Sequence, residues 1–190
     1  ASNLGKIVES AVQRQLSSHL EHLLPDSMYG FRKSRGTSDA LINVLDKVKD
    51  KLNAGQKVAV VALDATAAFD VLDHRLVFDS LALLGAGPAL QQWLIDYFQD
   101  RRSFVDIDGC QSTPWEVNVG AIQGGLISPD LFNVGSITQG LWTEFTDSTN
   151  FADDGLEIVS ADCEEDCQLL AEEAAKRMSS WYDAVGLTLN

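Results

Sequence analysis

The chain has one unbroken apolar run that ends on a carboxylate, and a second acidic motif follows much later in the sequence. Val58 to Leu63 has the composition of a β-strand, and Asp64 closes it. Further along, Phe151-Ala152-Asp153-Asp154 sets two adjacent carboxylates between short apolar stretches, which indicates a turn between two strands. A strand end and a tight turn are rigid places, so these segments can hold three carboxylates in fixed positions.

Asp64, Asp153 and Asp154 together predict a divalent-metal site. Magnesium prefers oxygen ligands and is usually held by one or two carboxylates plus substrate phosphates. Two such ions about 3.5–4 Å apart stabilise the attacking and leaving oxygens in phosphoryl transfer. The competing interpretation of Asp153 and Asp154 is a solvent-exposed turn, in which aspartate is common.

Length and composition indicate a globular chain. With 190 residues and 45% hydrophobic content it fits one domain or a large piece of one, and it can bury a sizeable core. The chain begins mid-pattern without an initiator Met, which is typical of a fragment. No stretch approaches the roughly 20 apolar residues of a membrane span, and no secretory signal precedes the first helix, so we expect no membrane partner. Three cysteines without zinc-type pairing favour reduced thiols and an intracellular protein, in the nucleus or the cytoplasm.

The charge is strongly polarised along the chain. The net charge of −14 argues at first against a nucleic-acid partner, because such binding depends on phosphate neutralisation by Lys and Arg. Residues 1–60, however, hold nine Lys/Arg against six Asp/Glu, whereas residues 61–190 hold five against 22. Part of the acidic excess is the metal site, and residues 162–173 are interpreted as a solvated acidic face at a helix start.

Hydrophobic periodicity predicts six helices and two hairpins. The helices are expected at residues 6–24, 38–52, 74–84, 88–98, from 129 onward and 164–184, and the hairpins at 103–119 and 150–160. Ser38 is predicted to cap the second helix, on one face of which Leu41, Val44, Leu45, Val48 and Leu52 fall. Leu169, Leu170, Ala174, Met178, Trp181 and Val185 are predicted to form the inner stripe of the last helix. This pattern indicates an α+β fold, a small antiparallel sheet backed by helices.

A compact basic loop lies between the first two helices. In Gly30-Phe31-Arg32-Lys33-Ser34-Arg35-Gly36-Thr37, three cations stand among glycines and small hydroxyl residues. This composition lets a backbone approach an anion while Arg32, Lys33 and Arg35 neutralise it. The alternative is a solvated surface cluster without a ligand.

Five collinear stretches give the chain a resemblance. They are residues 24–37, 62–74, 120–132, 151–154 and 181–190. In this order and spacing they resemble the fingers-to-palm segment of a reverse transcriptase of the non-LTR retrotransposon type, over nearly the whole chain. The resemblance implies a right-hand polymerase fragment, with fingers-side helices and the basic loop in residues 1–57 and the palm in residues 58–190.

The resemblance also implies roles for single residues. Asp64, Asp153 and Asp154 would hold two Mg²⁺ ions, with Mn²⁺ as a substitute, for nucleotidyl transfer from a dNTP to a primer 3′-OH. Phe69 would be the aromatic gate that rejects a ribonucleotide 2′-OH; without the motif it is interpreted as a core Phe at a helix start.

The resemblance also implies which residues contact the substrates. The nucleotide pocket would be lined by Ala68, Gln123 and Gly124. Arg32, Lys33 and Arg35 would meet an RNA template, paired with a DNA or RNA primer. Asp70, Asp73 and His74 are interpreted as turn and cap residues rather than catalytic groups.

Several positions depart from the usual pattern of the family. Ile122 replaces a proline, Gly125 a serine and Ser128 a glycine; Asp130 stands where an apolar residue is expected, and Ala67 where a basic one is common. These departures leave the carboxylates intact but affect substrate positioning. Two alternatives therefore remain: a catalytically inactive reverse-transcriptase-like module that binds nucleic acid or protein, and an unrelated acidic α+β interaction domain whose three aspartates lie far apart.

Overall fold

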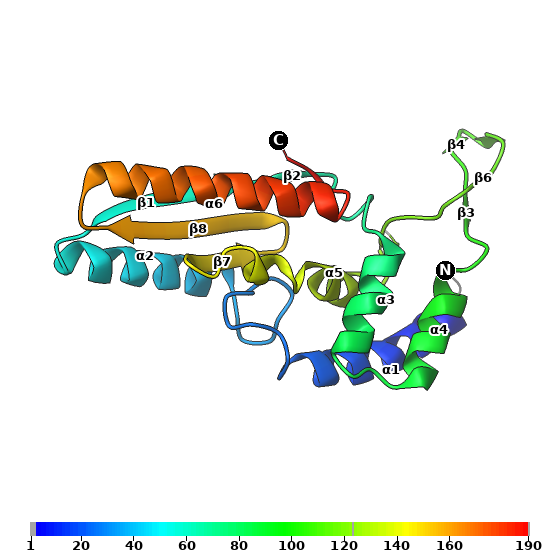
Figure 1. The fold of residues 1–190 in the computed structure, drawn as a ribbon. Coiled ribbons are helices and arrows are strands. Elements are labelled where there is room, and N and C mark those ends of the chain that lie inside the picture. Colours follow the sequence, from blue (N-terminus) through cyan, green and yellow to red (C-terminus); the bar gives the residue numbers. More distant parts are fainter. Residues whose placement is uncertain (1–2, 123, 190) are drawn as a thin grey trace.

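A three-stranded antiparallel sheet lies at the centre of one half of the molecule. The computed structural model describes residues 3–122 and 124–189. The strands β1 (Lys57–Leu63), β8 (Asp154–Ala161) and β7 (Asp147–Phe151) are hydrogen-bonded in the order β1-β8-β7. Helix α6 (Glu164–Ala184) packs on β1 and β8, and α2 (Thr37–Asn53) packs on the other side (Figure 1). The predicted α+β fold is confirmed.

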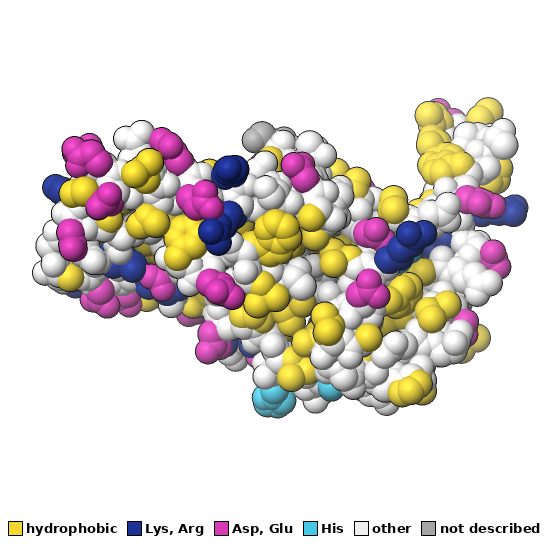
Figure 2. Space-filling view, viewed as in Figure 1, with side chains coloured by type: hydrophobic (Ala, Val, Ile, Leu, Met, Phe, Trp, Pro, Cys, Tyr) yellow, Lys and Arg dark blue, Asp and Glu magenta, His cyan; other side chains and the backbone are white. Residues whose placement is uncertain are grey.

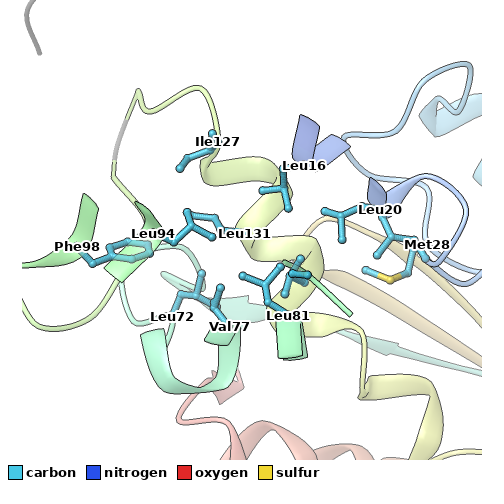
Figure 3. Close-up of a cluster of buried hydrophobic side chains, with 13 residues drawn as sticks. Leu16, Leu20, Met28, Leu72, Val77, Leu81, Leu94, Phe98, Ile127 and Leu131 are labelled. Carbon is cyan, nitrogen blue, oxygen red and sulfur yellow. The ribbon is translucent and has the colours of Figure 1, made fainter. Parts of the chain in front are cut away.

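The second half of the molecule is a helical layer around one apolar cluster. It comprises α1 (Asn3–Leu20), α3 (His74–Leu83), α4 (Pro88–Phe98) and α5 (Ser128–Ser136). Leu16, Leu81, Leu94, Ile127 and Leu131 are fully buried where these elements meet (Figure 3). Each buried side chain of this size contributes about 1.5–3 kcal/mol through the apolar area removed from water.

A second cluster joins α6 to the segment that follows β1. Ala65, Ala68, Phe132, Met178 and Trp181 are all buried there. Short strands β2 (Ala65–Thr66) and β9 (Thr188–Leu189) pair antiparallel at its edge, and the 3₁₀ turn η1 (Gln139–Leu141) lies between α5 and β7. Because Phe132 comes from α5, this cluster connects the helical layer to the sheet.

A hairpin projects from the helical layer (Figure 1). It contains β3 (Arg102–Ser103) paired with β6 (Trp115–Glu116), and β4 (Asp106–Ile107) paired with β5 (Cys110–Gln111). Hydrophobic side chains gather on its surface (Figure 2), including Phe104, Ile107 and Trp115. The predicted hairpin is therefore found, but its paired strand residues are all exposed.

The predicted helices are found with small shifts at their ends. Helices α3, α4 and α6 span nearly the expected residues, and Asp73 caps α3 by accepting a hydrogen bond from Arg75 N. The cap of α2 is Gly36 rather than Ser38, because the Asp39 carboxylate accepts from Gly36 N. None of the helices within residues 3–122 and 124–189 is long and apolar enough to span a membrane.

The apolar stripes of α2 and α6 are only partly buried. Val44 of α2 is buried, but Leu41, Leu45 and Leu52 are each more than half exposed, and so is Leu169 of α6. Periodicity correctly found the apolar stripe of α2. The rest of the chain buries Val44 but leaves Leu41, Leu45 and Leu52 of the same stripe largely exposed.

A buried carboxylate links α1 to α5. Asp130 is only 7% exposed, and its Oδ1 accepts a hydrogen bond from Ser17 Oγ at 2.9 Å. Burial raises the pKa of Asp130 above its ordinary value, and hydrogen bonds from Ser17 and Gln13 oppose that rise. The departure at this position thus provides a polar link between α1 and α5.

The raised pKa of Asp130 predicts a pH-dependent stability difference. Between the ordinary Asp pKa of 3.8 and the raised folded value, the folded state binds more protons than the unfolded state. Stability therefore falls as pH rises through that window. Asp130→Asn keeps an oxygen acceptor for Ser17 and removes the charge, so we expect a higher melting temperature than wild type at pH 7 and no difference below the unfolded pKa. Parallel pH profiles of the two melting temperatures would contradict this explanation.

Candidate active site

The pairing of β1 with β8 brings Asp64 to the acidic turn. Leu63 is registered opposite Gly155, so Asp64, the next residue, lies at the same end of the sheet as Asp154. Asp153 stands in the turn between β7 and β8, next to Ala152, which adopts a left-handed φ of 55°. Asp153 is half-buried, and Asp64 and Asp154 are exposed. The three carboxylates predicted from sequence therefore lie on neighbouring strand ends.

The negative charge of these carboxylates affects the pKa of Tyr182 in α6. Burial, together with the negative charges of Asp153, Glu157, Asp64 and Asp154, raises the pKa of its hydroxyl to about 12. Neither Asp153 nor Asp154 has an ion pair with a Lys or Arg among the described residues. The carboxylate oxygens gathered at this strand end suit a divalent metal in ligand type and charge.

The side chains of Asp64, Asp153 and Asp154 do not surround a common point. Within residues 3–122 and 124–189, no three Asp, Glu, His or Cys groups lie close enough to hold one ion together. The shared strand end is therefore observed, whereas the convergence of the three carboxylates on an ion stays a prediction.

Phe69 lies beside this strand end in an aromatic stack. Its ring is parallel to that of Phe132, with 4.4 Å between centroids and 15° between planes. Phe69 is half-buried, whereas Ala68 is 2% exposed and packs into the second cluster. The methyl group of Ala68 faces the core, and the contact of this residue with a nucleotide stays a prediction.

The glycine-rich loop is fixed directly to the Phe69 segment. Ala121 N donates to Phe69 O at 2.7 Å, and Gly120 N donates to Leu72 O at 2.8 Å. Gly120 has a φ of 90°, and a Cβ there would lie 2.5 Å from Asp70 O. His74 Nε2 also contacts Gly120 O at 2.8 Å, which supports its predicted structural role. Gly124, with a φ of 74°, borders open space; Gln123, predicted to line the nucleotide pocket, lies outside the described residues.

Two of the departures in this loop compensate for each other. Ser128 Oγ donates to Ile122 O at 2.7 Å. A Cβ on Gly125 would lie 2.7 Å from that same Oγ and 3.0 Å from Tyr97 Oη. The hydroxyl of Ser128 therefore occupies the space next to residue 125, and only glycine leaves room for it.

Glu9 anchors the same loop, although the sequence analysis did not single it out. It is 5% exposed, and its Oε1 accepts from Tyr97 Oη at 2.6 Å and from Leu126 N at 2.8 Å. One signal for it was present: Glu9 lies seven and eleven residues before Leu16 and Leu20, so it is a carboxylate on the buried stripe of α1.

The segment that opens the basic loop runs against the acidic hairpin. Met28 forms a parallel bridge with Asn150, and Tyr29 N donates to Asn150 O at 2.8 Å. A Cβ on Gly30 would collide with the backbone of Ala152, the residue before Asp153. Gly30 is therefore required for this close approach of two backbones.

Arg32 has a structural role instead of the predicted template contact. Its side chain is 3% exposed, and its guanidinium donates to Pro25 O at 2.6 Å, Met28 O at 3.1 Å and Glu21 O at 3.1 Å. It also pairs with the Glu21 carboxylate at 3.2 Å. These bonds hold the turn after α1, so the guanidinium is not available to an external phosphate.

Lys33 and Arg35 remain candidates for an anionic ligand. Lys33 is exposed, and Arg35 pairs with the exposed Asp26 at 2.5 Å, which lowers the pKa of that carboxyl. Arg35 also lies 5.5 Å from the centre of the Tyr29 ring. A surface pair of this kind is weak and exchanges readily for a phosphate.

A buried polar group lies behind the acidic turn, and sequence reasoning missed it as well. Glu157 is 0% exposed, and its Oε2 accepts hydrogen bonds from Thr146 and Ser148. Gln139 Nε2 and Asn150 Oδ1 are buried near Gly155, and neither has a hydrogen-bond partner within the described residues. Their local sequence gives no periodic signal, because only the sheet register brings them together.

Comparison with protein families agrees with the arrangement of these elements. The model of the family "Reverse transcriptase (RNA-dependent DNA polymerase)" matches residues 1–190. The chain belongs to this family.

Curated relatives place this reverse transcriptase chain near non-LTR elements. It is 27% identical over 135 residues to the RNA-directed DNA polymerase from mobile element jockey of Drosophila funebris, which covers 70% of the chain and 14% of the relative. It is 26% identical to the transposon TX1 uncharacterized 149 kDa protein of Xenopus laevis, over 68% of the chain and 10% of the relative. The chain thus spans about a seventh or less of these relatives.

Solved structures show the same fold. Apo telomerase from Candida tropicalis, truncated from its C-terminal domain, aligns with a TM-score of 0.72 at 15% identity, over 95% of this reverse transcriptase chain and 39% of its own. Telomerase from Candida albicans, in complex with a fragment of telomeric RNA, aligns with a TM-score of 0.73 at 12% identity, over 95% and 33%.

The contacts of Arg32 predict a stability effect that Lys33 lacks. Arg32→Ala should lower the free energy of unfolding by roughly 3 kcal/mol, because it leaves Glu21 and several buried carbonyls without a donor. Lys33→Ala changes an exposed side chain and should stay within about 0.5 kcal/mol of wild type. Urea unfolding of both variants measures the difference, and equal losses would rule out the structural role of Arg32.

The compensation between Gly125 and Ser128 predicts that substitutions at the two positions have non-additive effects on the free energy of unfolding. Gly125→Ser alone should cost about 1–3 kcal/mol through overpacking against Ser128. Ser128→Gly alone should cost about 1 kcal/mol through the lost hydrogen bond to Ile122. The double variant G125S/S128G should be more stable than the sum of the two losses predicts, by about 0.5–3 kcal/mol in denaturant unfolding. Strict additivity would show that the two positions are independent.

Proposed function

We propose that this chain is the core of an RNA-directed DNA polymerase. The observation that carries the proposal is the β1–β8 register, which sets Asp64 at the strand end shared with the Asp153-Asp154 turn. Family membership over residues 1–190 supports the same reaction class. The reaction is attack of a primer 3′-OH on the α-phosphorus of a dNTP, with pyrophosphate as the leaving group.

Asp64, Asp153 and Asp154 are proposed to hold two Mg²⁺ ions, for which Mn²⁺ can substitute. Bound there, the ions supply charge stabilisation for the attacking and leaving oxygens. The protein contributes the mounting: a strand end for Asp64 and a tight turn for Asp153, both fixed by one hydrogen-bonded ladder. Tyr182 keeps its proton at neutral pH because its pKa is about 12, so it adds no negative charge behind the site.

Template and nucleotide are proposed to meet the surfaces on either side of the turn. Phe69 offers an apolar ring at the sugar position, where a 2′-OH finds neither space nor a hydrogen-bond partner. Gly120 and Ala121 stand beside that ring through the Ala121–Phe69 hydrogen bond, and the loop that they begin is proposed to line the nucleotide pocket. Lys33 and Arg35 neutralise phosphates of an RNA template paired with a DNA or RNA primer.

A second candidate is a catalytically inactive module of the same family that binds nucleic acid or protein. It is favoured by the absence, among the described residues, of a group of three closely spaced metal ligands. The departures from the family pattern at Gly125 and Ser128 are weaker support for an inactive module than the sequence suggested, because these two residues compensate for each other.

Primer extension on an RNA template separates the two candidates. The longest polypeptide that the reading frame encodes should extend a primer with dNTPs in the presence of Mg²⁺. Asp153→Asn should lower the rate by at least about 100-fold, because it removes a charge that the transition state needs. The matched control is Asp162→Asn, an acidic residue at the far end of β8, which should retain wild-type activity. Equal activity of wild type and Asp153→Asn, or no extension by either, would contradict the polymerase proposal.

A further inference from the structure

Phe31 contacts the proposed sugar gate from the basic loop. Its ring lies 5.7 Å from that of Phe69, centroid to centroid, at 88° between planes. Phe69 is thus held by two aromatic neighbours, stacked on Phe132 of α5 and edge-on with Phe31. Aromatic pairs favour these two arrangements, because the ring edge is positive and the ring face negative.

The position of Phe31 is unusual for an aromatic residue that serves only the core. It is 48% exposed, it lines a cavity of about 680 Å³, and its φ is 60°. A bulky residue in this left-handed region is strained and persists only where the surroundings impose it. The contact with Phe69 is what this strained backbone provides.

Three contacts impose the conformation of the preceding residues. Tyr29 N donates to Asn150 O, Asn133 Nδ2 donates to Gly30 O at 2.9 Å, and the Gly30 backbone presses on Ala152. The ring of Phe31 is therefore mounted on a segment that is fixed to the acidic turn. Phe69 is fixed separately, through its own carbonyl, to Ala121. The two rings meet because the Phe31 backbone is anchored to the acidic turn and the Phe69 backbone to the glycine-rich loop.

We infer that Phe31 is a positioning residue for sugar selection: it holds the Phe69 ring in the orientation that excludes a ribose 2′-OH. This inference rests on the proposed polymerase function. Loss of the Phe31 ring removes one of the two aromatic supports of Phe69 and opens space toward the cavity into which that ring can turn. A turned ring leaves room for the hydroxyl, so discrimination falls while the reaction with deoxynucleotides continues.

The test compares incorporation of deoxynucleotides and ribonucleotides in the longest polypeptide of the reading frame. For Phe31→Ala, the ratio of kcat/KM for a dNTP to that for the matching rNTP should fall about fivefold, the size expected for one aromatic pair. Phe104→Ala is the matched control, since Phe104 is also 48% exposed but belongs to the projecting hairpin. Its ratio should equal that of wild type. Phe69→Ala should lower the ratio more than Phe31→Ala and serves as the positive reference.

A purely structural role would lower activity with both nucleotides equally and leave the ratio unchanged. An unchanged ratio in Phe31→Ala beside a lowered ratio in Phe69→Ala overturns the inference and leaves the polymerase proposal standing. If Phe31→Ala loses activity or folding, Phe31→Leu replaces it, and a wild-type ratio in that variant overturns the inference as well. A wild-type protein that incorporates neither nucleotide overturns the proposed function itself.

Discussion

The antiparallel pairing of β1 with β8 is the constraint on which the rest of the site depends. It joins segments separated by almost a hundred residues; its antiparallel direction sets Asp64 at the end of the sheet that bears the acidic turn, and its register sets Asp64 next to that turn. A shift of one residue would turn every side chain of β1 to the other face. The alternation that directs Leu63 and Ala59 toward α6 therefore also fixes where Asp64 lies.

Around that ladder, the remaining parts of the site are attached by backbone contacts more than by side chains. The glycine-rich loop binds the Phe69 segment through two amides, and residues 28–30 bind β7 in the same manner. Substitutions of exposed side chains in such segments change few contacts. Substitutions at Gly30 or Gly120, by contrast, push one backbone against another. Changes at residues 122, 125 and 128 are tolerated where a neighbour adjusts, as Ser128 does for Gly125.

Much of the fold could be predicted from local patterns, whereas the site could be predicted only in part. The helix ending near Ala184 and the turn at Asp153 follow from periodicity and turn composition. A helical stripe says which face is apolar but not what covers it, so periodicity found the stripe of α2 and could not show that Leu41 and Leu45 are exposed. Composition also cannot separate a buried arginine from an exposed one, so Arg32 and Lys33 looked alike. The partners that bury Arg32 are backbone carbonyls, which have no sequence signature.

The direct contact between Gly30 and Ala152 has a mechanical consequence. Side chains between two segments act as a compliant layer, since they change rotamer when one segment moves; here no such layer exists. A displacement of the Gly30 backbone therefore acts directly on the turn that bears Asp153. In the proposed polymerase, a shift of the basic loop that binds the template is therefore also a shift of the turn whose carboxylates align the reacting groups.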